Sequence, residues 1–129
     1  MGVAFYIELN KDDKDLDFNP WVEGKPIAWI FEELESFCKK HQIKAISDYV
    51  YQDISELEDE FAEHELPPQI AQWFDAQEGI LFIRNLRDKL IEEQSKLLDD
   101  NLEYALSEFL EVFTNAKRVG ARWHLAVDY

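Results

Sequence analysis

The residues best suited to acid–base chemistry stand near the two ends of the chain. Residues 3–9 and 121–129 each alternate between apolar and polar side chains, which predicts two strands with one buried face each. If these strands pair, their polar faces bring together Glu8, Arg122, His124 and Asp128. A histidine held by a carboxylate, with an arginine nearby, can exchange protons near neutral pH. The alternative, which we favour, is cross-strand charge pairing on a solvated sheet face.

An acidic segment in the middle of the chain is the stronger candidate for function. The chain has 28 Asp and Glu residues against 13 Lys and Arg, a net charge of −15. Ten of the acids, and no Lys or Arg, lie in residues 47–78. A helix beginning at Ser55 would place four of their carboxylates on one face, where like charges repel: Glu56, Asp59, Glu60 and Glu63. Such a face either keeps the protein in solution or binds a basic partner. Trp73 is the aromatic anchor of this candidate surface, unless it folds back onto the core.

Metal chemistry has weaker support in the sequence. Three aspartates have the spacing of the first ligands of an EF-hand loop: Asp13, Asp15 and Asp17. Phe18 replaces the turn glycine of that loop and Gly24 replaces its bidentate acid, which leaves weak calcium binding or a solvated loop. Glu60 and His64 could share a cation, but two ligands do not make a site. We therefore expect no metal site and no cofactor.

Motifs for nucleotide and covalent chemistry are absent from the sequence. It contains no P-loop, no glycine-rich dinucleotide fingerprint and no nucleophile elbow. The single cysteine, Cys38, excludes an internal disulfide and lies in an apolar helical stripe. We expect it to be a small buried residue in a protein of a reducing compartment.

Helical periodicity fills most of the chain between the two terminal strands. We expect helices from Pro26 to about residue 41, from about residue 75 to beyond Leu90, and from about residue 100 to Gly120, which ends the last of them. A short acidic helix after Ser55 and a short strand over residues 43–46 are also expected. Trp29 and Trp123 are expected in or beside the core, and Trp21 in a loop.

These elements predict a single acidic α+β domain over residues 1–129. A small sheet of two or three strands, with the N- and C-terminal strands paired, has about four helices packed on one face. The chain opens without a basic leader, and no apolar run approaches the roughly 20 residues that span a bilayer. We expect a soluble, cytoplasmic protein.

The ends of the chain also carry a resemblance. Gly2-Val3-Ala4-Phe5-Tyr6 at the start and Arg122-Trp123-His124-Leu125-Ala126-Val127-Asp128-Tyr129 at the end resemble small bacterial proteins of unassigned function. The similarity covers the whole chain and implies a bacterial, cytoplasmic protein. It implies no activity and no functional residues.

The charge pattern leads to one expected function and two alternatives. We expect a non-catalytic acidic binding module that docks a basic protein, an immunity or inhibitor protein being one concrete form. An acidic surface repels nucleic acid and anionic membranes, so we expect neither as a partner. The alternatives are a small enzyme using the polar face of the terminal strands, and a homo-oligomeric structural protein joined by apolar aromatic side chains.

Overall fold

The computed structural model describes residues 4–51 and 72–128, and its sheet joins the two ends of the chain. Strand β1 (Ala4–Leu9) pairs antiparallel with β3 (Arg122–Asp128), with Ala4 opposite Asp128 and Leu9 opposite Trp123. The short strand β2 (Phe74–Asp75) pairs with the other side of β3, so the strand order is β1-β3-β2. The predicted pairing of the terminal strands is confirmed, and β1 lies at an edge of the sheet.

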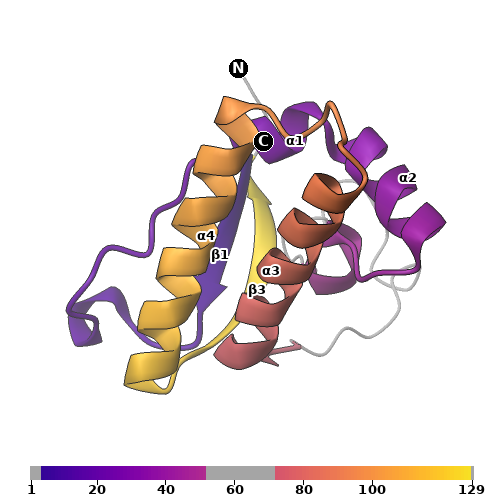
Figure 1. Ribbon diagram of the computed structural model, residues 1–129. Helices are drawn as coiled ribbons and strands as arrows, with labels where there is room; N and C mark the ends of the chain where they lie inside the picture. Colours follow the sequence, from indigo (N-terminus) through magenta and orange to yellow (C-terminus); the bar gives the residue numbers. More distant parts are fainter. Residues whose placement is uncertain (1–3, 52–71, 129) are drawn as a thin grey trace, which may run out of the picture.

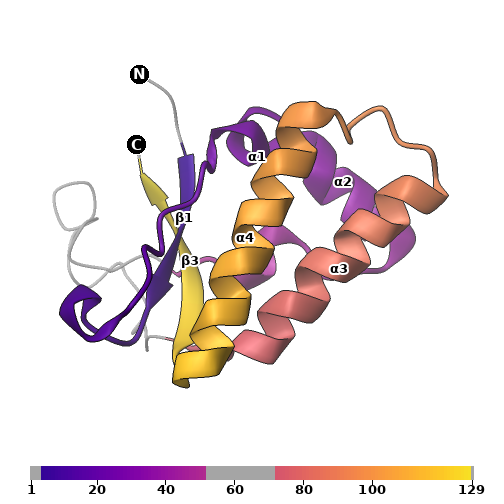
Figure 2. The same ribbon diagram turned by 60° about the vertical axis from the view of Figure 1, so that its left-hand side comes forward.

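Four helices cover one face of this sheet, as Figures 1 and 2 show. They are α1 (Lys25–Trp29), α2 (Phe31–His41), α3 (Ala76–Glu92) and α4 (Asp100–Val119). Two 3₁₀ turns, η1 (Asp13–Asp15) and η2 (Ile46–Tyr49), lie in the connections. The α+β fold is therefore as predicted. Within the described ranges, no helix has both the length and the apolar character that a membrane span requires.

The core lies between the sheet and the helices. Trp123 of β3 is 0% exposed, and its ring centroid lies 4.3 Å from that of Phe113 and 5.0 Å from that of Tyr49. The apolar stripes of α3 and α4 are buried as their spacing predicts. Gly79 lets these two helices approach closely, because a Cβ there would lie 2.8 Å from the Phe113 ring.

Both ends of α4 follow capping chemistry. The N-cap of α4 is Asp99, whose side chain accepts a hydrogen bond from the Leu102 amide at 2.8 Å. Gly120 ends this helix in the left-handed conformation at φ 71°, as expected. Asp75 precedes α3, but its side chain makes no cap hydrogen bond.

Other local predictions were wrong or lie outside the described residues. The helix expected from Pro26 is broken at Ile30 into α1 and α2. Trp29 is 64% exposed because it lies two residues, or about 200° of helical turn, from the buried Ile27. Residues 43–46 form no strand, since the chain enters the turn η2 at Ile46. The acidic helix expected after Ser55 lies outside the described residues.

Candidate functional site

The pairing of β1 with β3 places two of the four candidate acid–base residues together. Glu8 and His124 are directly opposite in the strand register. The Oε2 atom of Glu8 lies 2.9 Å from Nε2 of His124. An ionised carboxylate can only accept a hydrogen bond, so this contact needs a proton between the two side chains.

The imidazole of His124 is enclosed rather than solvated. The residue is 1% exposed, and its Nδ1 lies 3.2 Å from the backbone carbonyl oxygen of Gln72. A carbonyl only accepts, so Nδ1 donates that bond. The ring stacks against Trp73 at a centroid distance of 4.1 Å and lies 5.0 Å from the ring of Tyr51. The expectation of a solvated polar face thus fails at this residue, because these aromatic side chains cover it.

The other two candidates lie apart from this pair. The Arg122 Nε donates to Asp75 Oδ1 at 3.2 Å, on an exposed surface. Asp128 is exposed at the far end of β3, opposite Ala4. None of the three cavities described below is lined by His124. The structure therefore pairs a buried His124 with an exposed Glu8, and the imidazole lines none of these cavities.

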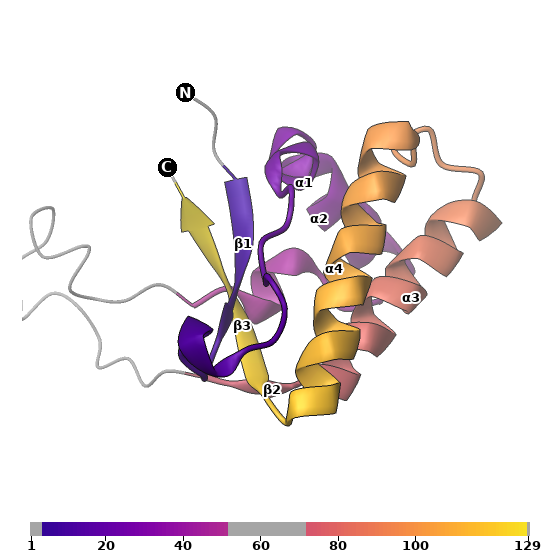
Figure 3. The ribbon, with the colours of Figure 1, turned by 90° about the vertical axis from the view of Figure 1, so that its left-hand side faces the viewer.

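His124 instead contacts the chain on both sides of residues 52–71, which belong to the acidic segment. Tyr51 precedes residues 52–71, and its amide donates to the Leu125 carbonyl at 2.8 Å. Gln72 and Trp73 follow those residues and contact the imidazole. Figure 3 shows that both described ends meet the sheet near β3. The side chain of His124 thus contacts the chain on both sides of residues 52–71 at one position.

The residues predicted to bind a partner have different outcomes. The four acids Glu56, Asp59, Glu60 and Glu63 lie outside the described residues. Trp73 is half-buried against His124, so its ring has a structural contact within the protein.

Replacing His124 with alanine is expected to lower the free energy of unfolding by about 2–4 kcal/mol. The change leaves a cavity between Trp73 and Tyr51 and removes the donor to the Gln72 carbonyl. The measurement is urea denaturation. Arg122→Ala is the matched control on the same strand, and its exposed ion pair predicts a loss of at most about 1 kcal/mol. Equal losses in the two variants would contradict this role for His124.

Cys38 is buried in α2, as predicted. Burial, together with the nearby charges of Glu35 and Asp48, raises the pKa of its thiol to about 11. The thiolate is the nucleophilic form of cysteine. Cys38 is therefore a neutral packing residue at physiological pH.

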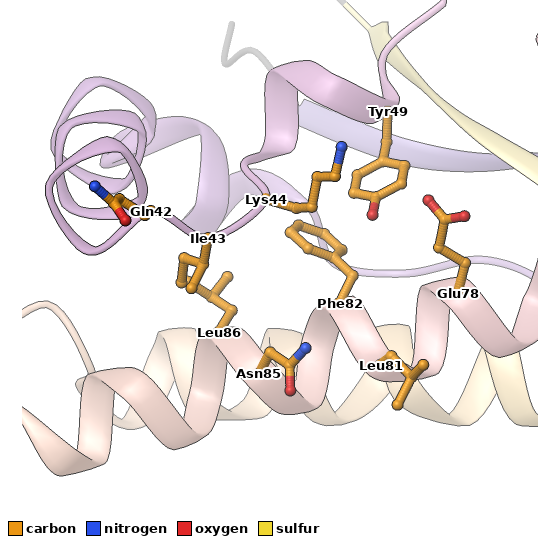
Figure 4. Close-up of a pocket in the computed structure, with 9 residues that line it drawn as sticks. All are labelled: Gln42, Ile43, Lys44, Tyr49, Glu78, Leu81, Phe82, Asn85 and Leu86. Carbon is orange, nitrogen blue, oxygen red and sulfur yellow. The ribbon is translucent and has the colours of Figure 1, made fainter.

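The cavity in Figure 4 lies between α3 and the segment that follows α2, and it has a volume of about 480 Å³. It is lined by Gln42, Ile43, Lys44, Tyr49, Glu78, Leu81, Phe82, Asn85 and Leu86. Burial raises the pKa of the Tyr49 phenol, and so do its hydrogen bond to Glu78 and the charges of Glu78 and Asp48. The phenol therefore stays protonated and acts as a hydrogen-bond donor, not as a base.

A larger groove of about 960 Å³ follows the outer edge of β1. We call it the edge groove, and its lining comprises residues 4–9, Lys11, Asp12, residues 19–22, Val127 and Asp128. Trp21 in this groove is 62% exposed. Sequence reasoning placed Trp21 in a loop, but it missed the groove, because the open backbone of an edge strand leaves no signal in side-chain types. A third cavity, of about 360 Å³, lies beside Trp29 and Phe31.

The described residues offer little for a metal ion. Asp17 of the predicted aspartate series binds Arg118 through two hydrogen bonds of 2.6 and 3.0 Å, and this contact lowers the pKa of the Asp17 carboxyl. Among residues 4–51 and 72–128, no cluster of three or more His, Cys, Asp or Glu side chains could hold a metal ion. Glu60 and His64 lie outside these ranges.

Comparisons with known proteins add no relative from which a function could be transferred. No protein-family model, no curated protein and no solved structure matches the chain. The bacterial resemblance of the chain ends stays a prediction.

Proposed function

We propose that this protein is a non-catalytic binding module that docks a basic protein. The observation that carries this proposal is the placement of charge: ten acids and no Lys or Arg in residues 47–78 of a chain with net charge −15. A field of one sign speeds the encounter with a partner of the opposite sign and discourages like-charged ones. An inhibitor or immunity protein for a basic toxin is one form that this docking would take.

The geometry around His124 favours this proposal over an enzyme. A catalytic histidine must reach substrate, whereas His124 is 1% exposed and both of its ring nitrogens contact protein groups. His124 also supports a docking role, because it anchors the described residues on both sides of residues 52–71, which belong to the acidic segment.

A homo-oligomeric structural protein is less well supported. Exposed Trp21 and Trp29 could contribute to such an interface. However, each added copy carries a further charge of −15, and this like-charge repulsion opposes self-association.

We place the docking in the bacterial cytoplasm. The resemblance of the chain ends to small bacterial proteins supports this location, and a single buried cysteine suits a reducing compartment.

The test is affinity capture with the immobilised protein from the lysate of its own cells, loaded at low salt and eluted at high salt. Wild-type protein is expected to release a basic protein in the salt step. A variant with Glu56→Gln, Asp59→Asn, Glu60→Gln and Glu63→Gln should bind the purified partner at least about tenfold more weakly, because the attraction between opposite charges is lost.

The matched control removes the same charge from exposed helical positions: Glu32→Gln, Glu33→Gln, Asp88→Asn and Glu111→Gln. It should retain most of the binding if the acidic segment is the docking surface. Affinity that is unchanged between low and high salt would overturn the proposal, since exposed charges are screened beyond about 10 Å at 0.1 M salt. Equal losses of binding in the two variants would show that the net charge of the protein, and not the acidic segment, determines the affinity.

A further inference from the structure

The outer edge of β1 has backbone groups that no described residue uses. The Asn10 amide donates to the Arg122 carbonyl at 3.0 Å, so the even-numbered residues of this strand bond towards β3 and the odd-numbered ones face outwards. The backbone groups of Phe5 point away from β3, and its amide donates to the Gly24 carbonyl at 3.4 Å. Within the described ranges, the backbone groups of Ile7 and Leu9 have no partner on this side. Edge strands with open groups are templates for pairing with another strand.

The outer wall of the edge groove consists of residues 19–22. Contacts with α4 anchor the chain on both sides of this wall. Arg118 of α4 binds Asp17 through two hydrogen bonds, and the Glu23 amide donates to Glu108 Oε1 at 3.1 Å. Between these two anchors, the amide of Trp21 donates to Asn19 Oδ1 at 3.0 Å. The wall with its exposed indole is therefore preorganised, which lowers the entropic cost of binding.

The charges of the edge groove favour a basic occupant. Its ionisable lining is Glu8, Asp12 and Asp128 against Lys11. Glu8 is held by His124. The Asp12 carboxylate lies 3.9 Å from the Lys14 ammonium in an exposed ion pair, and such surface pairs are weak, so Asp12 and Asp128 remain accessible to a ligand. A second copy of this chain would bring the same carboxylates against each other, and like charges opposed across strands are unfavourable.

We propose that the edge groove binds an extended, basic segment of the partner protein by β-strand addition. The segment lies antiparallel to β1 and pairs its backbone with Ile7 and Leu9, and its apolar residues pack towards Trp21. Its Lys or Arg side chains lie beside Asp12 and Asp128. This inference rests on the proposed function for the charge of the partner, and it adds a second surface, the edge groove, with its mode of binding.

Strand geometry predicts which side of the segment faces β1. Directly opposed residues in neighbouring strands have side chains on the same face of the sheet. The bound residues opposite Ile7 and Leu9 are therefore those with side chains on the helical face. In a peptide of alternating Lys and Val, the valines suit that face and the lysines suit the face that carries Glu8.

The probe is an octapeptide of alternating Lys and Val, tested against the full chain by NMR. Its binding is expected to slow hydrogen exchange at the Ile7 and Leu9 amides by at least about tenfold, because they become hydrogen-bonded. N-methylation of the valines removes the amide hydrogens that face β1 and should abolish this protection. N-methylation of the lysines alters the opposite edge of the peptide and should leave it in place.

Two matched pairs of variants test the side-chain contacts. Trp21→Ala should weaken peptide binding by about tenfold, as expected for an aromatic anchor. Trp29→Ala, at the same exposure outside the edge groove, should change the affinity by less than about twofold. Asp12→Asn with Asp128→Asn should weaken binding by about threefold or more, whereas Asp88→Asn with Glu111→Gln should not.

Three outcomes would overturn the inference. The first is equal binding of the two N-methylated peptides, and the second is equal effects of Trp21→Ala and Trp29→Ala. The third is protection of Ile7 and Leu9 that rises with protein concentration in the absence of peptide, which would identify a second copy as the occupant.

This inference and the proposed function can fail separately. If a captured basic partner binds in a salt-dependent way and its affinity is unchanged by Trp21→Ala, the proposed function stands and the edge groove is not its site. If the peptide protects the edge while no basic partner is captured, the groove binds strands and the proposed function fails.

Discussion

Replacing Trp123 with alanine is expected to lower the free energy of unfolding by about 3–5 kcal/mol. Trp123 is 0% exposed, and its indole contacts elements from three regions of the chain through the rings of Tyr49, Phe74 and Phe113. Its Nε1 also donates to the Asp75 carbonyl at 2.8 Å, so the substitution leaves that acceptor without its donor. Urea denaturation, followed by circular dichroism, measures the change.

Trp29→Ala is the matched control for this prediction. The same side chain is removed, but at 64% exposure, and surface substitutions usually change stability by less than about 0.5 kcal/mol. Similar losses at both positions would contradict the assignment of Trp123 to the centre of the core.

Alanine at position 24 is expected to cost about 3 kcal/mol, at the upper end of the usual effects of overpacking. A Cβ on Gly24 would lie 1.7 Å from the backbone oxygen of Phe5. The backbone angles of Gly24, φ −94° and ψ 0°, lie at negative φ, where residues with a side chain are also found. The cost is therefore one of space: β1 and the start of α1 must separate, and the hydrogen bond from the Phe5 amide to Gly24 is lost. Thermal and urea unfolding both measure it.

Gly120 provides the control, because its backbone conformation, and not the space around it, favours glycine. No atom lies within 4 Å of a Cβ built there, but its φ is 71°. Asparagine tolerates this left-handed conformation, so Gly120→Asn should be nearly neutral while Gly24→Asn should be as harmful as Gly24→Ala. Full stability of the Gly24 variants would show that β1 and α1 can separate freely.

The residue pattern predicted the elements and the pairing of the terminal strands correctly because those signals are local. Alternation over a strand marks which side chains share a face, as at Trp123 and Leu125. Helical spacing together with a terminal glycine marks α4, which ends at Gly120. The break at Ile30 was missed, since the apolar stripe runs on through it and no proline or glycine marks it.

The candidate acid–base site was only half predictable. Alternation placed Glu8 and His124 on one face, and antiparallel pairing made them neighbours. The same logic could not separate them from Arg122, which turns to Asp75. That choice depends on β2, a strand of two residues with no period to recognise.

What the sequence determined by itself is the class of the fold, the faces of its long elements and the strongly negative charge. Each of these depends on residue types and their short-range spacing. Only the tertiary structure decided that His124 is covered, because Tyr51 and Trp73 reach it from distant parts of the chain. It also decided that the outward backbone groups of Ile7 and Leu9 bond to no described residue, because the partner of a strand edge is set by which segments pack beside it and not by the side chains of the strand.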